Sequence, residues 1–165
     1  RLAQMDADGQ HDPISLPALF AGLDAGADVV VGSRYLDGSP PPTTLARRIG
    51  SGLFSRIVTW WTRTRITDAT SGYQAMSGRA VDTLANDGFP EDYPDADVLI
   101  TLARAGLKIT EVPVKMHSRT SGLSMHRGGR VAYYAYKMLL TLALLPVRRP
   151  TPFRRRDTVA PTPTR

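Results

Sequence analysis

The spacing of apolar residues predicts a helix and then a strand near the start of the chain. Asp12 and Pro13 fit a helix N-cap and a first helical residue, and Gly26 is a typical helix end. Residues 27–34, ADVVVGSR, are a short β-branched run that predicts a buried strand. A helix and a strand this close together favour an α/β fold. The apolar stripe of the helix consists of Leu16, Leu19, Phe20 and Leu23.

Three more helices are predicted further along the chain. Residues 44–63 form the longest and residues 78–85 a short one, and a third begins at Asp95 or Asp97 and ends at Gly106. An amphipathic helix has its apolar residues at intervals of three and four. In the longest helix the residues at near-helical spacing are Leu45, Ile49, Leu53, Ile57 and Trp61.

Three short segments predict strands around these helices. Residues 1–5 form a weak strand before an acidic turn, and residues 68–76 form a loop that leads into a second strand. Residues 108–116, KITEVPVKM, predict a third strand, in which Pro113 indicates a bend or an edge. Residues 39–42, SPPP, are incompatible with regular structure and predict a loop.

Residues 131–147 are the most apolar segment, and they are fewer than the roughly 20 residues that span a bilayer. Tyrosines near one end and arginines beyond the other are typical of an interfacial helix. A helix packed on the domain core fits the same pattern equally well. Residues 148–165 have the composition of a disordered basic tail. We therefore expect a folded domain over residues 1–128 and an apolar helix over residues 129–147, followed by the tail.

The formal net charge of +6 is concentrated at the C-terminal end. Residues 147–165 carry six arginines and one aspartate, which leaves the rest of the chain close to neutral. A basic tail suits an anionic membrane surface, whereas a nucleic-acid-binding domain is expected to have a basic face on its folded part. We therefore expect no nucleic-acid partner. The absence of cysteine excludes disulfides and thiol chemistry.

Residues 5–13, MDADGQHDP, place three aspartates within seven residues. An EF-hand loop beginning at Asp6 would have His11 at its glycine position and Pro17 at its glutamate position, which excludes calcium binding of this kind. A phosphatase of the haloacid dehalogenase type matches only in part, because Gln10 stands where a hydroxyl residue is expected. Two carboxylates one residue apart, with the Gln10 carbonyl, would offer hard oxygen ligands to Mg²⁺ or Mn²⁺. A solvated acidic turn fits the pattern equally well.

Several sequence blocks, taken in order, resemble the family 2 glycosyltransferases with a GT-A fold. The similarity covers roughly residues 2–126 and is greatest to dolichyl-phosphate mannose synthases and bacterial polyprenyl-phosphate glycosyltransferases. It implies a partial GT-A domain of α/β, Rossmann-like type. Because Arg1 is not an initiator methionine and the family's nucleotide-binding first half is missing, we expect a fragment of a longer protein. The blocks are DADGQHDP, GADVVVGSRY, DATSGYQAMSGRAV, YPDADVL and ITEVPVKMHSRTSGLSMH.

By this resemblance, Asp6 and Asp8 correspond to the DxD motif of the family, and Gln10 corresponds to an additional residue on the metal side. We expect Asp8 and Gln10 to bind Mg²⁺ or Mn²⁺ directly. Asp6 is expected nearer the nucleotide ribose or a metal-bound water. His11 is left outside the site, because a lone histidine beside a turn usually makes structural hydrogen bonds.

The resemblance also implies residues that meet the two anionic substrates, a nucleotide-diphosphate sugar and a polyprenyl phosphate. Positive side chains must offset the repulsion between them, and Arg34, Arg47 and Arg119 are the candidates. Asp68 and residues 71–72 match the acceptor-side loop of the family, where Asp68 either orients the substrate or caps the turn.

The acceptor decides whether a general base is needed. A phosphate is already ionised at neutral pH and needs no strong base. A sugar hydroxyl would need a carboxylate, which related enzymes keep near the positions of Asp95 and Asp97, although both residues also fit a helix N-terminus. Where many relatives have a lysine, this chain has Met125 and His126.

We therefore expect an inverting, metal-dependent transferase that moves a sugar to a polyprenyl phosphate at the cytoplasmic face of the membrane, as part of cell envelope biosynthesis. Two alternatives stay open. One is transfer to a hydroxyl of a glycan. The other is a non-catalytic, membrane-associated fragment that lacks the nucleotide-binding half.

Overall fold

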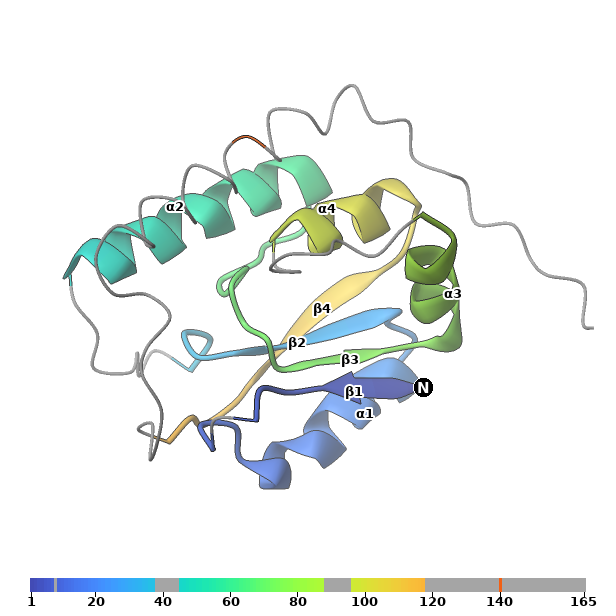
Figure 1. Cartoon of the computed structure of the whole chain (residues 1–165), viewed down its shortest axis with the longest axis horizontal. Helices are drawn as coiled ribbons and strands as arrows, with labels where there is room; N and C mark the ends of the chain where they lie inside the picture. Colours follow the sequence, from blue (N-terminus) through green and yellow to red (C-terminus); the bar gives the residue numbers. More distant parts are fainter. Residues whose placement is uncertain (8, 38–44, 88–95, 118–139, 141–165) are drawn as a thin grey trace, which may run out of the picture.

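The computed structural model of the chain describes residues 1–7, 9–37, 45–87, 96–117 and 140, without the side chains of residues 45–47. Within these residues one mixed sheet has helices on both faces (Figure 1), which confirms the predicted α/β fold. The strands are β1 (Leu2–Gln4), β2 (Val29–Ser33), β3 (Gln74–Met76) and β4 (Ile109–Pro113). On one face lies α1 (Leu16–Asp24), and on the other lie α2 (Leu45–Thr62), α3 (Gly78–Asp87) and α4 (Ala96–Arg104).

The direction of the strands brings several loops to one edge of the sheet. The strand order is β1-β3-β2-β4, in which β2 pairs with β4 in parallel and β3 runs antiparallel to β1 and β2. Consequently β1, β2 and β4 end at the same edge, where β3 begins; we call it the carboxyl edge, and it lies on the left in Figure 1. In open α/β sheets, ligands bind outside the carboxyl ends of parallel strands.

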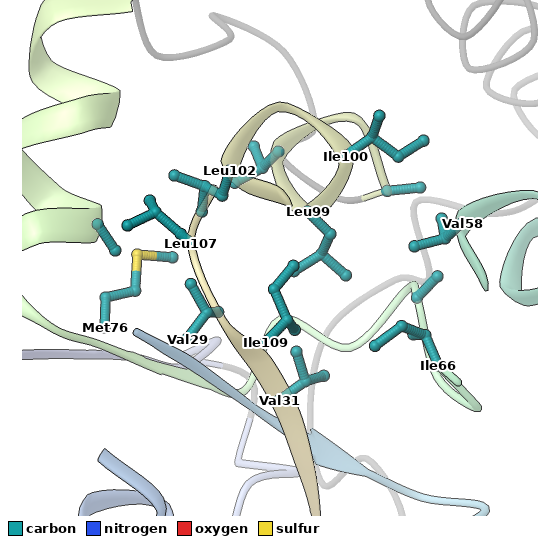
Figure 2. Packing of buried hydrophobic residues seen from close by; sticks show 14 of the residues in the cluster. Val29, Val31, Val58, Ile66, Met76, Leu99, Ile100, Leu102, Leu107 and Ile109 are labelled. Atoms are coloured by element: carbon teal, nitrogen blue, oxygen red, sulfur yellow. The ribbon is translucent and has the colours of Figure 1, made fainter. Parts of the chain in front are cut away.

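The core is built on β2, whose five residues are all buried. Side chains alternate along a strand, so Val29 and Val31 face α2, α3 and α4, whereas Val30 faces α1. Figure 2 shows Val29 and Val31 beside Ile109 of β4 and beneath Leu99 of α4. Each such buried side chain contributes roughly 1.5–3 kcal/mol. A strand with two apolar faces accounts for the unbroken valine run.

The first helix begins later than the sequence predicts. The Asp12 carboxylate accepts a hydrogen bond from the Ile14 N–H at 3.0 Å, and the Asp12 carbonyl accepts one from the Ser15 N–H at 3.1 Å. These contacts tighten Pro13–Ser15 into a 3₁₀ turn, η1, before α1 begins. The predicted end is confirmed, since Gly26 has a φ of 92°, which favours glycine.

The predicted apolar stripe of α2 is wrong in part. Ile49 and Leu53 are 63% and 50% exposed, whereas Phe54 and Val58 are buried and pack in the core cluster with α4. The helix carries apolar residues on more than one face, so periodicity alone did not identify the buried one. Ile57 and Trp61, both in the predicted stripe, are partly buried against the core.

The predicted interfacial helix, apart from Leu140, lies outside the described residues, as does the basic tail. Leu140 is helical and 43% exposed. In the part of the chain that the structure describes, no helix is both long enough and apolar enough to cross a bilayer.

Candidate functional site

Four segments from different parts of the sequence meet at the carboxyl edge. The acidic turn at residues 5–12 follows β1, Arg34 follows β2, the loop at residues 68–72 precedes β3, and His117 lies beyond β4. Hydrogen bonds and close contacts join these segments in two groups, one around Arg34 and one around the acidic turn. Because the sheet fixes the ends of its strands, the side chains are held by a rigid scaffold.

The first group is centred on an ion pair between Arg34 and Asp68. The guanidinium donates from Nε to Oδ2 of Asp68 and from Nη2 to Oδ1, both at 2.6 Å. The Arg34 backbone N–H also donates to Oδ2 at 3.1 Å, and Nη2 donates to the Thr70 hydroxyl at 2.9 Å. The Asp68 side chain is fully buried, whereas that of Arg34 is 24% exposed. The pair thus fixes a cation that still reaches solvent at the carboxyl edge.

A carboxylate that sequence reasoning missed supports this pair from β4. Glu111 accepts hydrogen bonds from the backbone N–H groups of Thr67 and Asp68, each at 2.9 Å, and from the Thr67 hydroxyl at 2.8 Å. Ser33, at the end of β2, contacts the same hydroxyl at 2.6 Å. The alternation of side chains along β4 was the available signal, because it places Glu111 on the same face as the buried Ile109.

The second group places the Asp6 carboxylate against the acceptor-side loop. A Cβ atom on Gly72 would lie 3.0 Å from both carboxylate oxygens of Asp6. Glycine at this position therefore lets the backbone of the loop approach the acidic turn closely. Two segments that the sequence analysis assigned to the donor and acceptor sides thus meet here.

His11 fixes the acidic turn by a structural hydrogen bond, as the sequence predicts. Its Nδ1 accepts a hydrogen bond from the Asp6 N–H at 2.9 Å, so the ring proton lies on Nε2. The buried ring stacks on Tyr73, with 4.8 Å between ring centroids. Burial, and then the negative charge of Asp12, raise the pKa of the Tyr73 phenol, whose hydroxyl donates to the Asp12 carbonyl at 3.0 Å.

His117, in the segment after β4, contacts the same turn at Gln10 and Asp12. The His117 N–H donates to the Gln10 carbonyl at 2.9 Å, and the Gln10 side-chain amide approaches the His117 carbonyl at 3.4 Å. His117 Nε2 lies 3.0 Å from Oδ2 of Asp12. The Ile14 N–H and then the His117 ring lower the pKa of Asp12 below its ordinary value. The turn is therefore tied to both β3 and the end of β4.

Of the remaining predicted site residues, the structure describes only Asp97 with its side chain. Asp97 is buried in the first turn of α4, where its Oδ1 accepts from the Val98 N–H at 2.9 Å, as an N-terminal helix residue would. Asp8, Asp95, Arg119 and the side chain of Arg47 lie outside the described residues.

The metal site stays a prediction. Among the residues that the structure describes, which omit Asp8, no three His, Asp or Glu side chains form a group suited to a metal ion. Asp6 is exposed at the turn, and Gln10 is partly buried beside it. Carboxylate and amide oxygens are ligands that suit Mg²⁺ and Mn²⁺, so the donor chemistry of these residues fits such an ion.

Comparison with known proteins finds relatives for most of the chain, although no protein-family model matches it. It is 35% identical over 135 residues to the undecaprenyl-phosphate mannosyltransferase of Micrococcus luteus, a match that covers 79% of this chain and 54% of the relative. It is 30% identical over 144 residues to the polyprenol monophosphomannose synthase of Mycolicibacterium smegmatis, covering 83% and 53%. Glycosyltransferase AglJ of Haloferax volcanii is 28% identical over 120 residues, covering 72% and 39%. The chain spans about half the length of the first two relatives.

Proposed function

We infer that this chain belongs with the family 2 glycosyltransferases, and we propose that it transfers a sugar to a polyprenyl phosphate as part of a protein of that kind. The observation that carries the proposal is the meeting of the acidic turn, Arg34 and the loop at residues 68–72 at one edge of the sheet. The names of two relatives support mannose as the sugar and a polyprenyl phosphate as the acceptor.

The proposed reaction is a single displacement with inversion. An oxygen of the polyprenyl phosphate forms a bond to C1 of the sugar, and the bond from C1 to the nucleoside diphosphate breaks. No proton has to be removed, because the phosphate is already ionised at neutral pH. The main electrostatic obstacle is the approach of two anions. Arg34 offsets this repulsion, since its guanidinium is held in a fixed orientation and is still partly exposed.

Asp6, Asp8 and Gln10 are the proposed metal-side residues. They would hold a Mg²⁺ or Mn²⁺ ion, which would supply positive charge beside the diphosphate leaving group. Asp6 is exposed, and its carboxylate lies close to the backbone of Gly72. His11 holds the backbone of Asp6 through the hydrogen bond from the Asp6 N–H to Nδ1.

An anionic membrane surface is the proposed location of the acceptor, on the cytoplasmic side. The outward face of α2 supports this, because it combines large apolar side chains with cations. Ile49, Leu53 and Trp60 are 63%, 50% and 74% exposed, and Arg48 and Arg56 are exposed on the same face. Tryptophan and arginine beside aliphatic residues are typical of helices that lie in the headgroup region. Arginine complements the negative charge of the lipid surface.

The test of the proposed function compares two acceptors that differ only in the phosphate. The protein that contains this chain is incubated with a nucleoside-diphosphate mannose labelled in the sugar, and either a polyprenyl phosphate or the corresponding polyprenol. We expect label in the lipid fraction only with the phosphate. Equal labelling of the polyprenol, or labelling of a glycan in preference to both lipids, would contradict the proposal.

A further inference from the structure

Glu111, a partly buried residue of β4, accepts several hydrogen bonds from one short segment of the chain. Its two carboxylate oxygens accept from three donors, which are two consecutive backbone N–H groups and one hydroxyl. All three donors belong to Thr67 and Asp68, in the segment that crosses the carboxyl edge between α2 and β3. Charge-assisted hydrogen bonds of this type are roughly twice as strong as neutral ones.

The chemistry of these contacts favours a carboxylate over an amide at position 111. Oε1 of Glu111 accepts from both backbone N–H groups at 2.9 Å, and Oε2 accepts from the Thr67 N–H at 2.9 Å and from the Thr67 hydroxyl at 2.8 Å, so each donor meets an acceptor. A glutamine could keep its carbonyl oxygen at the Oε1 position, but its NH₂ group would then stand against the Thr67 N–H, and the negative charge would be lost. The carboxylate therefore holds the Thr67–Asp68 peptide in a way that an amide of the same size does not.

The Asp68 side chain extends this contact to Arg34. Because Glu111 fixes the backbone of Asp68, it fixes the position from which the Asp68 carboxylate grips the guanidinium. Asp68 is fully buried, so its carboxylate has little room to adjust if the backbone shifts. Thr70, which accepts from Nη2 of Arg34, lies in the same loop.

We propose that Glu111 is a positioning residue for Arg34, acting through the backbone and carboxylate of Asp68 to hold the guanidinium where it meets the acceptor phosphate. The assignment of that phosphate rests on the proposed function. Glu111 itself touches no substrate in this account. Its effect is confined to the orientation of one cation, which the proposal assigns to the acceptor phosphate, whereas the donor diphosphate is assigned chiefly to the metal-side residues; recognition of the acceptor should therefore change much more than recognition of the donor.

The first experiment measures the orientation of Arg34 directly, without turnover. In the folded chain, the Nε–H of Arg34 donates to Asp68, so its NMR signal is expected to exchange slowly with solvent. Glu111→Gln is expected to speed this exchange about tenfold, because the grip of Asp68 loosens. Glu111→Asp keeps the anion and is expected to retain slower exchange than Glu111→Gln. Unchanged exchange in Glu111→Gln would overturn the proposal.

Asp28→Asn is the matched control. Asp28 is also a buried carboxylate that accepts from a backbone N–H, that of Lys108 at 3.0 Å, and pairs with an arginine, Arg79 at 3.2 Å. It precedes β2 and therefore lies at the opposite edge of the sheet. We expect Asp28→Asn to lower thermal stability to the same extent as Glu111→Gln without altering the exchange rate of the Arg34 signal. An equal change in both variants would mean that Glu111 is only a general support of the fold.

The second experiment uses steady-state kinetics of the protein that contains this chain. Glu111→Gln is expected to raise the KM for polyprenyl phosphate about tenfold and to leave the donor KM within about twofold. Equal changes in both KM values would overturn the proposal. Absence of transfer to any polyprenyl phosphate by the unaltered protein would instead contradict the proposed function, and the Arg34 exchange rate would still decide the role of Glu111.

Discussion

At the scale of single residues, the buried Asp68 carboxylate holds the Arg34 guanidinium in its position. It accepts two hydrogen bonds from the guanidinium and one from the Arg34 backbone. A buried carboxylate without a cation is costly, because water cannot replace the lost partner. Both residues were predicted as site residues, but their pairing depends on the meeting of two segments that are distant in sequence. The ion pair therefore has a structural role in addition to the proposed one.

Because the Asp68 carboxylate is buried, removing its cation should lower the stability of the fold. Arg34→Met should destabilise the fold by about 3 kcal/mol, the lower end of the cost of breaking a buried pair, because Arg34 is partly exposed. The double variant Arg34→Met/Asp68→Asn should recover more than half of that loss, since the buried charge is removed as well. Denaturant unfolding of the single and double variants measures the loss and the recovery as changes in the free energy of unfolding. A double variant less stable than Arg34→Met would contradict this account.

The acidic turn gives a pH prediction at the same scale. The pKa of Asp12 is lowered from 3.8, first by the Ile14 N–H and then by His117, so the ionised form is favoured in the folded state. The resulting stabilisation is present above pH 3.8 and is lost as the pH falls through the lowered pKa. NMR titration of the carboxyl should show the low pKa.

His117→Ala provides the control for that titration. Removing the His117 ring should raise the Asp12 pKa only part of the way towards 3.8, because the Ile14 N–H still donates a hydrogen bond to the Asp12 carboxylate. An Asp12 pKa at or above the ordinary value in the unaltered chain would show that the two contacts are not formed in solution.

At the scale of elements, the carboxyl edge depends on the close approach of the acidic turn and the loop before β3. Hydrophobic spacing and glycine or proline signals were sufficient to predict β2, the end of α1 and the presence of α2. They were not sufficient to show that β3 lies antiparallel between β1 and β2, because strand order is set by tertiary packing. The Glu111 contacts were missed for the same reason, since their donors lie more than forty residues away in sequence.

Gly72→Ala tests the contact between these two elements. The added Cβ would lie 3.0 Å from both oxygens of Asp6, so the carboxylate has to move. We expect affinity for the nucleoside diphosphate, measured by calorimetry with Mn²⁺ in the protein that contains this chain, to fall about tenfold. Gly52→Ala is the control, because a Cβ there has nothing within 4 Å. Unchanged affinity in Gly72→Ala would show that the position of the Asp6 carboxylate does not affect donor binding.

At the scale of the whole molecule, the carboxyl edge and the outward face of α2 place the proposed phosphate site and the proposed lipid-facing surface on one small domain. Ile49, Leu53 and Trp60 lie opposite the buried Phe54 and Val58 on the same helix. The sequence alone gave the wrong face for part of this helix, because both faces carry apolar residues and only packing on α4 distinguishes them. The exposed face of α2 is therefore identified by the structure and not by the sequence.

Ile49→Ser/Trp60→Ser tests the membrane contact. Loss of two exposed apolar side chains should reduce pelleting with vesicles that contain anionic lipid several-fold. The matched control is Leu2→Ser/Ile14→Ser, which removes exposed apolar residues outside α2 and should leave pelleting unchanged. Equal pelleting of both double variants would show that the α2 face does not contact the membrane.

We propose that the carboxyl edge recognises the acceptor phosphate through Arg34, and steady-state kinetics of two lysine variants can detect this recognition. Lysine keeps the charge but not the two-pronged grip on Asp68, so Arg34→Lys disturbs the orientation of the cation. The control is Arg79→Lys, at the opposite edge of the sheet, where Arg79 pairs with Asp28. We predict a KM for polyprenyl phosphate about tenfold higher in Arg34→Lys and unchanged in Arg79→Lys, with the donor KM unchanged in both. An unchanged acceptor KM in Arg34→Lys would contradict the account.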